Sequence, residues 1–371
     1  MPRPLFGYVA GAAETNASLR DNRDVFGEWA FRPRFLVDVS RRSAAVTLFG
    51  TEYATCFGIA PMGISAMMAY RGDLALTRAA AAARVPMIMS GSSLIPLEEI
   101  VRANPDAWFQ AYLPGEPDRI AALVGRVADA GYRTLVLTVD TTTLGNRENN
   151  IRTGFSTPLR PSLRLAWDGA IRPTWLWDVL WRTLRQHGMP HFENSYVTRG
   201  APIIAKDVQR DFGARDHLNW THLAQIRRQW RGNLVVKGIL TGEDAARCKE
   251  EGADGVIVSN HGGRQLDGAI APLRAVAEVK ATAGGMTVMM DGGVRRGSDV
   301  LKAIALGADF VFVGRPMLYA AAVGGEVGVR HAISILSDEV HRNLAFLGCN
   351  RIGEVGMQHL VRVAGVPTSR G

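Results

Sequence analysis

Eight short apolar runs recur along the chain, and most are followed by an alanine-rich amphipathic stretch. Each run contains β-branched or aromatic residues and ends in polar residues or glycine. The runs are Phe57–Pro61, Pro86–Ser90, Trp108–Leu113, Thr134–Asp140, Leu234–Ile239, Gly255–His261, Thr287–Gly293 and Phe310–Arg315. Continuous apolar strands that alternate with helices indicate a parallel sheet covered on both faces. Eight such units in 371 residues predict an α/β protein with a (β/α)8 TIM barrel.

The segments between these runs show the periodicity of surface helices. The clearest are Asp73–Arg84, Pro117–Ala130, Gly242–Glu251, Pro272–Thr282 and Gly297–Leu306. A doubly wound open sheet would alternate strands and helices in the same way. That fold usually carries G-x-G-x-x-G after its first strand, and no such motif follows Phe57–Pro61 here. The barrel is therefore the favoured prediction.

We predict one domain, residues 1–371, in which residues 151–218 form a long insertion after the fourth strand. The insertion contains Trp167, Trp175, Trp177 and Trp181, half of the eight tryptophans. Within Trp175–Gln186 an apolar stripe recurs at helical spacing, made of Leu176, Val179, Leu180, Thr183 and Leu184. Interfacial tryptophans, an apolar stripe and basic residues are typical of a helix that lies in a membrane surface. The alternative is a helix that covers the active site or packs on another subunit.

The composition excludes several classes of protein. An apolar fraction of 47% and a charged fraction of 21% are those of a globular chain, and no apolar run approaches a bilayer span. Three cysteines without a C-x-x-C argue against a disulfide framework, and the first residues lack a secretion signal, so we expect a cytoplasmic protein. The net charge of +8 suits a phosphorylated cofactor, a carboxylate substrate or an anionic membrane. The arginines are scattered along the chain and form no basic stripe, so we expect no nucleic-acid partner.

Polar residues lie at the carboxyl-terminal ends of seven successive runs. Because the chemistry of a barrel normally lies at that end of the strands, these residues are candidate site residues. They are Ser90, Gln110, Thr138, Asp140, Lys237, Ser259, His261, Asp291 and Arg315.

The stretch Ser259–Gly268, with the sequence S-N-H-G-G-R-Q-L-D-G, is the most informative of these ends. An imidazole at a strand end, two glycines and an arginine place a proton acceptor beside an anion receptor. A lone histidine is more often structural, but Arg264 and the glycines favour a catalytic role for His261. Asp140 is a candidate to orient that imidazole. Arg147 could hold a carboxylate or form a surface ion pair.

The last two strand ends indicate a phosphate site. Asp291, Gly292, Gly293 and Arg295 follow the seventh run, and Gly314 and Arg315 follow the eighth. Barrels commonly bind phosphate with glycine amides in these two loops, and arginines add charge-assisted hydrogen bonds. Glycine turns with solvated arginines are the alternative. Lys237, inside an apolar run, requires a negative partner at the barrel mouth.

The histidine pairs His187/His191 and His217/His222 lack a companion acid or cysteine in a metal-ligand arrangement, so no metal site is expected.

Taken together, S-N-H-G-G-R-Q-L-D-G, D-G-G-V-R-R-G, T-V-D-T, F-Q-A-Y and V-K-G-I resemble the FMN-dependent L-2-hydroxy-acid oxidase and dehydrogenase family. That family includes glycolate oxidase, lactate dehydrogenase and (S)-mandelate dehydrogenase. The resemblance runs over nearly the whole chain. The segments Asn22–Phe26, Leu36–Ser43 and His187–Pro190 look closest to the mandelate dehydrogenase branch.

The resemblance implies a role for each matching residue. His261 matches the active-site base and Asp140 its carboxylate partner. Arg264 and Arg147 match the groups that hold the substrate carboxylate, and Tyr8 and Tyr112 match its hydroxyl contacts. The remaining matches are to the FMN site: Pro61, Met62, Gly63, Ser90, Gln110, Thr138, Lys237, Ser259, Asp291, Gly292, Gly293, Arg295, Gly314 and Arg315. Gly63, where glycolate oxidase-like members have alanine, again resembles the mandelate dehydrogenase members.

What the resemblance implies is oxidation of an L-2-hydroxy acid, mandelate- or lactate-like, to the 2-oxo acid. Electrons would pass from FMN to a quinone-type acceptor at the inner face of the cell membrane, where the protein would be peripheral, and the enzyme would be a homotetramer. The alternative is a soluble oxidase that uses O2 and produces H2O2. An FMN barrel isomerase, a nucleotide-binding barrel dehydrogenase or a non-catalytic flavin protein would not require His261, Arg264 and Arg147 together.

Overall fold

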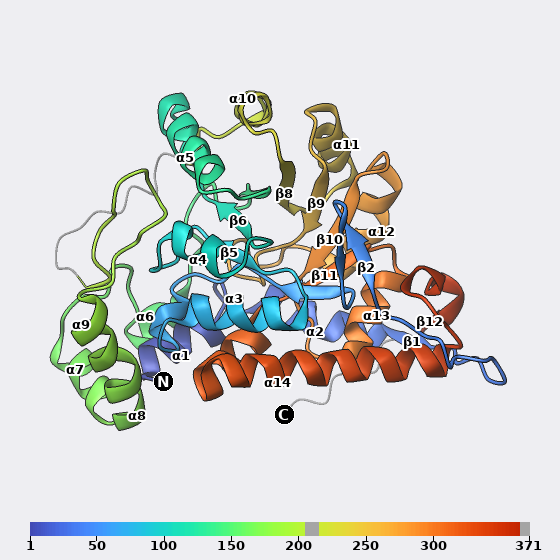
Figure 1. The fold of residues 1–371 in the computed structure, drawn as a ribbon, viewed down its shortest axis with the longest axis horizontal. Helices are drawn as coiled ribbons and strands as arrows, with labels where there is room; N and C mark the ends of the chain where they lie inside the picture. Colours follow the sequence, from blue (N-terminus) through green and yellow to red (C-terminus); the bar gives the residue numbers. More distant parts are fainter. Residues whose placement is uncertain (205–214, 364–371) are drawn as a thin grey trace.

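Eight parallel strands form a nearly closed barrel in the computed structural model, which describes residues 1–204 and 215–363 (Figure 1). The strands are β4 (Phe57–Ile59), β5 (Ile88–Ser90), β6 (Trp108–Ala111), β7 (Thr134–Thr138), β8 (Asn233–Ile239), β9 (Gly255–Val258), β10 (Thr287–Asp291) and β11 (Phe310–Val313). They pair in the order β4-β11-β10-β9-β8-β7-β6-β5, and a bridge between Ile59 and Met87 joins the two ends. The predicted (β/α)8 barrel is confirmed, and every predicted run matches one strand, with β8 beginning one residue before its run.

The interior of the barrel is filled by one layer of large apolar side chains. The layer belongs to a single buried cluster that includes Ala60, Ile88, Trp108, Val136, Val235, Ile257, Met289 and Phe312. Because side chains alternate between the two faces of a strand, the residue two positions further along points into the barrel as well. Counting two residues along each strand identifies a second layer above the first. It consists of Met62, Ser90, Gln110, Thr138, Lys237, Ser259, Asp291 and Gly314. Six of the eight residues of the second layer are polar, and this layer forms the floor of the site.

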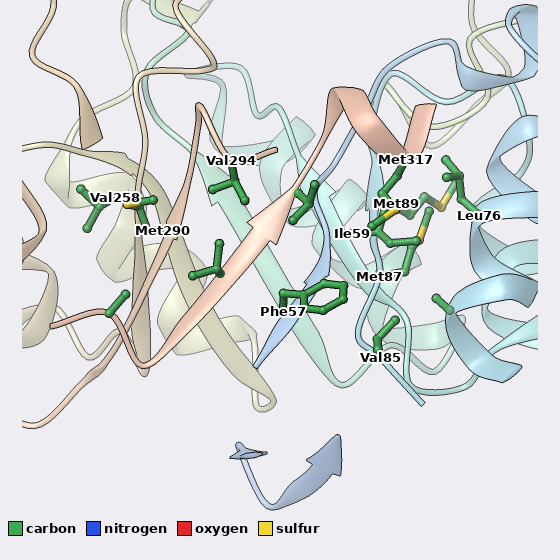
Figure 2. Packing of buried hydrophobic residues seen from close by; sticks show 14 of the residues in the cluster. Phe57, Ile59, Leu76, Val85, Met87, Met89, Val258, Met290, Val294 and Met317 are labelled. Atoms are coloured by element: carbon green, nitrogen blue, oxygen red, sulfur yellow. The ribbon is translucent and has the colours of Figure 1, made fainter. Parts of the chain in front are cut away.

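Helices cover the outer face of the barrel. They are α3 (Gly72–Ala83), α4 (Leu97–Ala103), α5 (Pro117–Asp129), α10 (Trp220–Gln229), α11 (Gly242–Glu250), α12 (Pro272–Thr282), α13 (Gly297–Ala305) and α14 (Arg315–Leu347). Outward strand residues such as Phe57, Ile59 and Met87 pack with Leu76 of α3 and Met317 of α14 (Figure 2). The five predicted helices agree with the structure to within one residue at each end. The long α14 changes direction at Gly324 and Gly325, where the backbone leaves helical geometry.

The amino-terminal end of the barrel is closed by a hairpin. Strands β2 (Val46–Leu48) and β3 (Thr51–Tyr53) flank Phe49, whose ring centroid lies 5.6 Å from that of Trp108. Strands β1 (Trp29–Phe31) and β12 (Leu360–Arg362) pair outside the barrel. The remaining short 3-10 turns are η1 (Val25–Glu28), η2 (Ser65–Met67), η5 (Ile352–Glu354) and η6 (Met357–His359). With its lower end filled, the barrel is open only at the carboxyl-terminal end of its strands.

Two amino-terminal helices lie across that open end. Helix α1 (Arg3–Ala10) packs on α6 (Glu148–Thr153), and α2 (Ala17–Asp24) lies against the loops after β9 and β10. Asp267 ties α2 to the β9 loop, because its carboxylate accepts hydrogen bonds from the Ser18 amide at 2.9 Å and from the Thr15 hydroxyl at 2.7 Å. The chain before the first barrel strand therefore helps to build the rim of the site.

The segment between β7 and β8 contains α6 (Glu148–Thr153), α7 (Leu163–Ala170), α8 (Pro173–Trp175), the π-helical turn η3 (Leu176–Trp181) and α9 (Arg182–His187). Helices α7, α8 and α9 lie together at one side of the barrel (Figure 1). Residues 205–214 of the predicted 151–218 insertion lie outside the described residues.

The amphipathic helix predicted at Trp175–Gln186 is present, and its apolar stripe packs on the rest of the protein. Val179 is buried, Leu176, Leu180 and Leu184 are half-buried, and the Trp175 indole donates a hydrogen bond to the Met67 carbonyl at 2.7 Å. The apolar stripe therefore faces the protein. The opposite face exposes Trp177 and Trp181, which form an edge-to-face pair with centroids 6.0 Å apart.

Candidate active site

A cavity of about 580 Å³ opens at the carboxyl-terminal end of the barrel strands. Most of the residues predicted from the sequence line it: Tyr8, Pro61, Met62, Gly63, Tyr112, Thr138, Arg147, Lys237, His261, Arg264, Asp291, Gly292, Gly293, Arg295, Gly314 and Arg315. Ser90, Gln110, Asp140 and Ser259 lie one step behind this wall, each in contact with another predicted residue. The structure thus brings all the predicted residues to one place.

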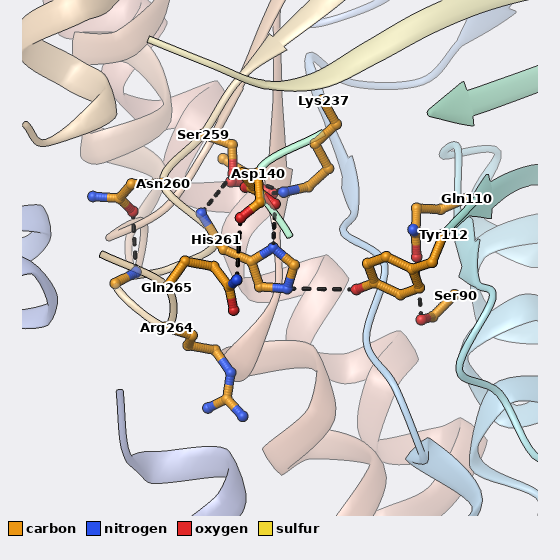
Figure 3. A network of polar contacts seen from close by, with 12 residues as sticks. Ser90, Gln110, Tyr112, Asp140, Lys237, Ser259, Asn260, His261, Arg264 and Gln265 are labelled. Carbon is orange, nitrogen blue, oxygen red and sulfur yellow. Dashed lines mark hydrogen bonds and ion pairs between the residues drawn. The ribbon is translucent and has the colours of Figure 1, made fainter. Parts of the chain in front are cut away.

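His261 is held in a fixed orientation at the cavity wall. Its Nδ1 atom lies 2.8 Å from Oδ1 of Asp140, and its Nε2 atom lies 3.4 Å from the hydroxyl of Tyr112 (Figure 3). The backbone of His261 has φ +58°, and its amide donates to the Ser259 hydroxyl at 3.0 Å. A carboxylate can only accept, so the proton of a neutral imidazole resides on Nδ1. Nε2 is then the basic nitrogen, and it faces the cavity.

The charges around this pair keep the imidazole neutral and the carboxylate ionised. Burial, together with the nearby charges of Lys237 and Arg147, lowers the pKa of His261 below its usual value, although Asp140 raises it. Burial also opposes ionisation of Asp140, but His261, Lys237 and Arg147 together hold its pKa below the usual value. At neutral pH the pair is therefore a neutral base beside an anion, which is the state that can accept a proton.

Lys237 is buried in the polar layer of the barrel and is paired with Asp291. Its Nζ lies 3.1 Å from Oδ2 of Asp291 and donates to the Ser259 hydroxyl at 2.7 Å. Burial would lower the pKa of Lys237, but Asp291 and Asp140 raise it above the usual value. The prediction that Lys237 has a negatively charged partner is confirmed. Asp291 keeps the positive charge of Lys237 at the floor of the cavity.

Two guanidinium groups lie on the His261 side of the cavity. Arg264 Nη1 donates to the carbonyls of Tyr8 at 2.6 Å and Gly11 at 2.7 Å, and the guanidinium stacks on the Tyr8 ring at 4.6 Å. Its buried Nη2 has no hydrogen-bond partner among the described residues. Burial and the neighbouring Arg147 lower the pKa of Arg264 to about 9, so this position favours an incoming anion. Arg147 donates from Nη2 to Gln265 at 2.6 Å.

A second pair of arginines lies above β10 and β11, and Arg315 is close to the first pair, because Arg315 and Arg264 both donate to the Gly11 carbonyl. Arg315 Nε donates to the Val9 carbonyl at 2.8 Å, and Arg295 donates to its neighbour Val294 at 2.8 Å. Burial lowers the pKa of Arg295, and burial together with Arg295 lowers that of Arg315 to about 10. Gly293 has φ +80°, and a Cβ there would lie 1.7 Å from the Asn22 carbonyl oxygen. Only glycine allows α2 to approach this loop.

The floor between the two arginine pairs carries polar atoms that have no partner within the described residues. The Ser90 hydroxyl lies 3.3 Å from the Gln110 side-chain oxygen. The other amide atom of Gln110, Nε2, is buried without a hydrogen-bond partner in the part of the chain that the structure describes, as are Thr138 Oγ1 and Asp291 Oδ1. Buried polar groups are normally satisfied, so these atoms indicate a ligand with complementary donors and acceptors.

Sequence reasoning missed several residues that hold the site together. Asn22 of α2 and Asn260 exchange two side-chain hydrogen bonds at 2.8 and 2.7 Å, and Asn260 also accepts from the Gly263 amide at 3.0 Å. These bonds set the His261 loop against α2. Arg215 and Phe155 also line the cavity. No local pattern marks such residues, because their partners lie far away in the sequence.

The histidine pairs considered for metal binding are used elsewhere. His222 Nδ1 accepts the Asn219 amide at 3.1 Å and caps α10, and His217 lies 3.2 Å from Asp216. His187 contacts the Tyr70 hydroxyl at 2.9 Å. Among residues 1–204 and 215–363, no three His, Cys, Asp or Glu side chains are grouped as metal ligands.

A (β/α)8 barrel with an imidazole, a buried lysine and two pairs of arginines in one cavity at the carboxyl-terminal ends of its strands has the features of an enzyme active site. The profile of the FMN-dependent dehydrogenase family matches residues 1–362. The chain therefore belongs to the FMN-dependent dehydrogenase family, whose cofactor is FMN.

Similar proteins cover almost all of the chain. It is 39% identical to (S)-mandelate dehydrogenase of Pseudomonas putida, with 97% of this chain and 90% of that protein covered. It is 37% identical to L-lactate dehydrogenase of Caulobacter sp. (strain K31), with 98% and 95% covered. Among solved structures, the monotopic membrane protein (S)-mandelate dehydrogenase has a TM-score of 0.87 and 37% identity, with 98% and 96% covered. Mandelate oxidase with benzoyl-formic acid has a TM-score of 0.80 and 33% identity, with 99% and 95% covered.

The polar and charged atoms that line the cavity are complementary to FMN. The unpartnered Gln110 Nε2 and Thr138 Oγ1 can meet the polar edge of a flavin, and Arg295 and Arg315 offer the charge that a phosphate requires. Lys237 supplies a buried positive charge between them. No helix among residues 1–204 and 215–363 has the length and apolar character to cross a bilayer.

Proposed function

We propose that the protein oxidises an L-2-hydroxy acid, mandelate- or lactate-like, to the 2-oxo acid. The observation that supports this most is the convergence of His261, Arg264 and Arg147 on one wall of the cavity. A 2-hydroxy acid needs one group to take a proton and two donors to hold its carboxylate. The relatives named as mandelate and lactate dehydrogenases favour the same substrate class.

His261 is the proposed base. Its Nε2 faces the cavity because Asp140 engages Nδ1, and the lowered pKa keeps that nitrogen unprotonated at neutral pH. When Nε2 takes a proton from the substrate, Asp140 at 2.8 Å stabilises the imidazolium that forms. The Tyr112 hydroxyl, 3.4 Å from Nε2, is placed to contact the substrate oxygen.

Arg264 and Arg147 are the proposed carboxylate receptors. Planar guanidinium groups bind a carboxylate through paired hydrogen bonds, which fixes its orientation as well as its position. Arg264 is already anchored by the Tyr8 and Gly11 carbonyls through Nη1, so its Nη2 remains directed for the ligand. This anchoring limits the loss of side-chain entropy on binding and sets the substrate α-carbon in a reactive position.

The proposed FMN site uses the rest of the cavity. Arg295, Arg315, Gly292, Gly293 and Gly314 would hold the phosphate end. Gln110, Thr138, Ser90 and Lys237, with the loop Pro61–Gly63, would hold the flavin, and Ser259 and Asp291 would position the lysine. Bound FMN supplies the redox chemistry, because it accepts the two electrons that leave the hydroxy acid. The buried charge of Lys237 would stabilise negative charge that reaches this end of the site.

The proposed electron acceptor is a membrane quinone. We propose that the protein binds peripherally to the inner face of the membrane, where it can reach this acceptor. The exposed side chains of Leu163, Trp167, Trp177 and Trp181 support this, because they form the outer face of α7, η3 and their surroundings. Exposed arginines accompany them, which suits an anionic surface. The solved relative described as a monotopic membrane protein favours the same location. The predicted homotetramer stays a prediction.

A soluble oxidase that passes electrons to O2 is the second candidate, favoured by the similarity to mandelate oxidase. Anaerobic mixing with the two enantiomers of mandelate and lactate tests the reaction itself. We expect one enantiomer to bleach the flavin absorbance, and His261→Asn to abolish bleaching while FMN stays bound. Reoxidation by a soluble quinone analogue, compared with air, separates the two acceptors. Failure of every hydroxy acid to bleach the flavin would refute the proposal.

A further inference from the structure

Arg215 places another guanidinium group at the cavity, away from the two that face His261. It is the first described residue after the insertion's undescribed stretch, and it lines the cavity together with Tyr112 and Ser92. Its guanidinium carbon lies 4.6 Å above the centroid of the Tyr112 ring. Tyr112 in turn reaches His261 through its hydroxyl at 3.4 Å. Arg215 and His261 therefore approach the same tyrosine, one through the ring face and the other through the hydroxyl.

Stacking on Tyr112 gives this guanidinium a defined direction. A guanidinium that lies over an aromatic face keeps its N–H donors in its own plane, where they can still bind an anion. The stack also reduces the side-chain entropy that Arg215 loses when a ligand binds. The Coulomb effect of Arg215 on Tyr112 opposes the rise in the pKa of that hydroxyl, whose main cause is burial. The positive charge is thus felt within the cavity.

The other cationic side chains of the cavity have distinct places. Arg295 and Arg315 lie above β10 and β11, Lys237 is paired with Asp291, and Arg147 and Arg264 lie on the His261 side. A 2-hydroxy monocarboxylate brings one negative charge, which Arg147 and Arg264 already suit. Arg215 adds positive charge to the cavity above the ring of Tyr112. A substrate whose side chain reaches Arg215 binds more tightly if that side chain ends in a negatively charged group.

We propose that Arg215 is a specificity-determining residue that binds a second carboxylate, so that the preferred substrates are L-2-hydroxy dicarboxylic acids. This inference rests on the proposed function, and it names the substrate class of the same site. Arg147 and Arg264 hold the carboxylate beside the hydroxyl, and Arg215 holds the one at the far end of the side chain. The reaction is unchanged: the hydroxyl and α-carbon hydrogens leave with two electrons, and both carboxylates remain intact.

Matched substrates test the proposal on the FMN-bound enzyme. L-malate and L-2-hydroxybutyrate differ by a carboxylate in place of a methyl group, as do L-2-hydroxyglutarate and L-2-hydroxyvalerate. We expect the rate constant for anaerobic flavin reduction divided by Kd to be at least about tenfold higher for the dicarboxylate of a pair, as one charged hydrogen bond provides. Arg215→Met should reduce this preference by about 10- to 100-fold, and Arg215→Lys should retain part of it. Reduction by the monocarboxylates should change less than about threefold.

Controls separate this proposal from a structural role. Arg133→Met, at a side chain 74% exposed on the outside of the barrel, should leave the preference unchanged. A wild-type preference for the monocarboxylates, or an equal loss for both members of a pair in Arg215→Met, would overturn the proposal. Perturbation of the oxidised flavin spectrum by 2-oxoglutarate and 2-oxovalerate provides a second readout that needs no turnover. If no hydroxy acid reduces the flavin, the proposed function fails. The proposed role of Arg215 is then judged by binding alone: the wild type should bind 2-oxoglutarate more tightly than 2-oxovalerate, and Arg215→Met should lose this difference.

Discussion

The Nδ1 atom of His261 lies 2.8 Å from Oδ1 of Asp140, and this single contact decides which nitrogen of the imidazole faces the cavity. The side chains come from distant parts of the chain, since Asp140 follows β7 and His261 follows β9. Both strands must be in place before the imidazole of His261, the proposed base, has a fixed tautomer. The barrel therefore supplies the orientation that a histidine in a flexible segment lacks.

Replacement of Asp140 tests this relationship. Asp140→Asn keeps the size of the side chain but removes the charge, so kcat/KM for the hydroxy acid should fall roughly 100- to 10,000-fold. The wild-type kcat/KM should fall on the acid side of pH 6.5, because the pKa of His261 lies below that value and the base must be unprotonated. Asp140 raises the pKa of His261, so in the variant this acid limb should move to lower pH. A pH–rate profile measures both effects.

A limb at the same pH in both enzymes would contradict the assignment of His261 as the titrating base. Asp106→Asn, at an exposed carboxylate outside the barrel, is a matched control and should leave the profile unchanged.

The Lys237–Asp291 pair predicts a stability effect that can be separated from catalysis. Lys237→Met leaves a buried carboxylate without its cation, so the free energy of unfolding should fall by about 3–5 kcal/mol. Adding Asp291→Asn removes the stranded charge and should recover part of that loss. Flavin reduction should remain impaired in the double variant, because the buried positive charge is still missing. Urea unfolding and anaerobic flavin reduction give the two readouts. Equal stability of the single and double variants would refute the interpretation.

Much of this site is predictable because two periodicities coincide. Apolar runs fix the strands, and a period of two then places Thr138 and Lys237 directly above Val136 and Val235. Since β7 and β8 are paired in register, residues that end neighbouring runs become neighbours in space. Six of the eight predicted runs extend past the carboxyl-terminal ends of their strands. At His261, for example, the chain turns with φ +58° and leaves the sheet.

The rest could not be predicted, because it depends on contacts between distant segments. Asn22 and Asn260 are separated by more than 230 positions, and neither belongs to a periodic pattern. The helix at Trp175–Gln186 shows a different limit. The spacing of its apolar residues correctly indicates two faces, but tryptophans lie on both of them, so the pattern alone does not tell which face meets the protein. The structure turns Val179 inward and Trp177 outward.

Asp73, at the start of α3, makes stability depend on pH. Its side chain is buried, and burial raises its pKa to about 7 against weaker opposing effects of Ser93 and Arg71. The folded protein then holds a proton that the unfolded chain, with a pKa near 3.8, releases. This contribution favours folding at pH below about 4 and is lost as pH rises to about 7.

Asp73→Asn removes that dependence, because an amide stays neutral at every pH. The variant should be more stable than the wild type at pH 8 by roughly 2–4 kcal/mol, at about 1.4 kcal/mol per unit of pKa shift. At pH 5 the difference should shrink. Urea unfolding at the two pH values measures it, with the exposed Asp106→Asn as the control. A stability difference that does not change with pH would show that Asp73 is ionised in the folded protein.

The exposed tryptophans of the insertion give the last prediction. Trp167, Trp177 and Trp181 are 67%, 60% and 53% exposed, which is unusual for so large an apolar side chain unless another surface covers it. Their joint replacement by serine should weaken binding to phosphatidylglycerol-containing vesicles by on the order of tenfold per tryptophan.

A double variant, Phe35→Ser with Phe346→Ser, removes two equally exposed rings elsewhere and should bind as the wild type does. Co-sedimentation at low and high salt measures the binding. Because the flavin site lies at the barrel mouth, flavin reduction by hydroxy acids should be the same in all three proteins. Equal loss of vesicle binding in both variants would mean that exposed apolar area in general, and not this face, holds the protein at the membrane.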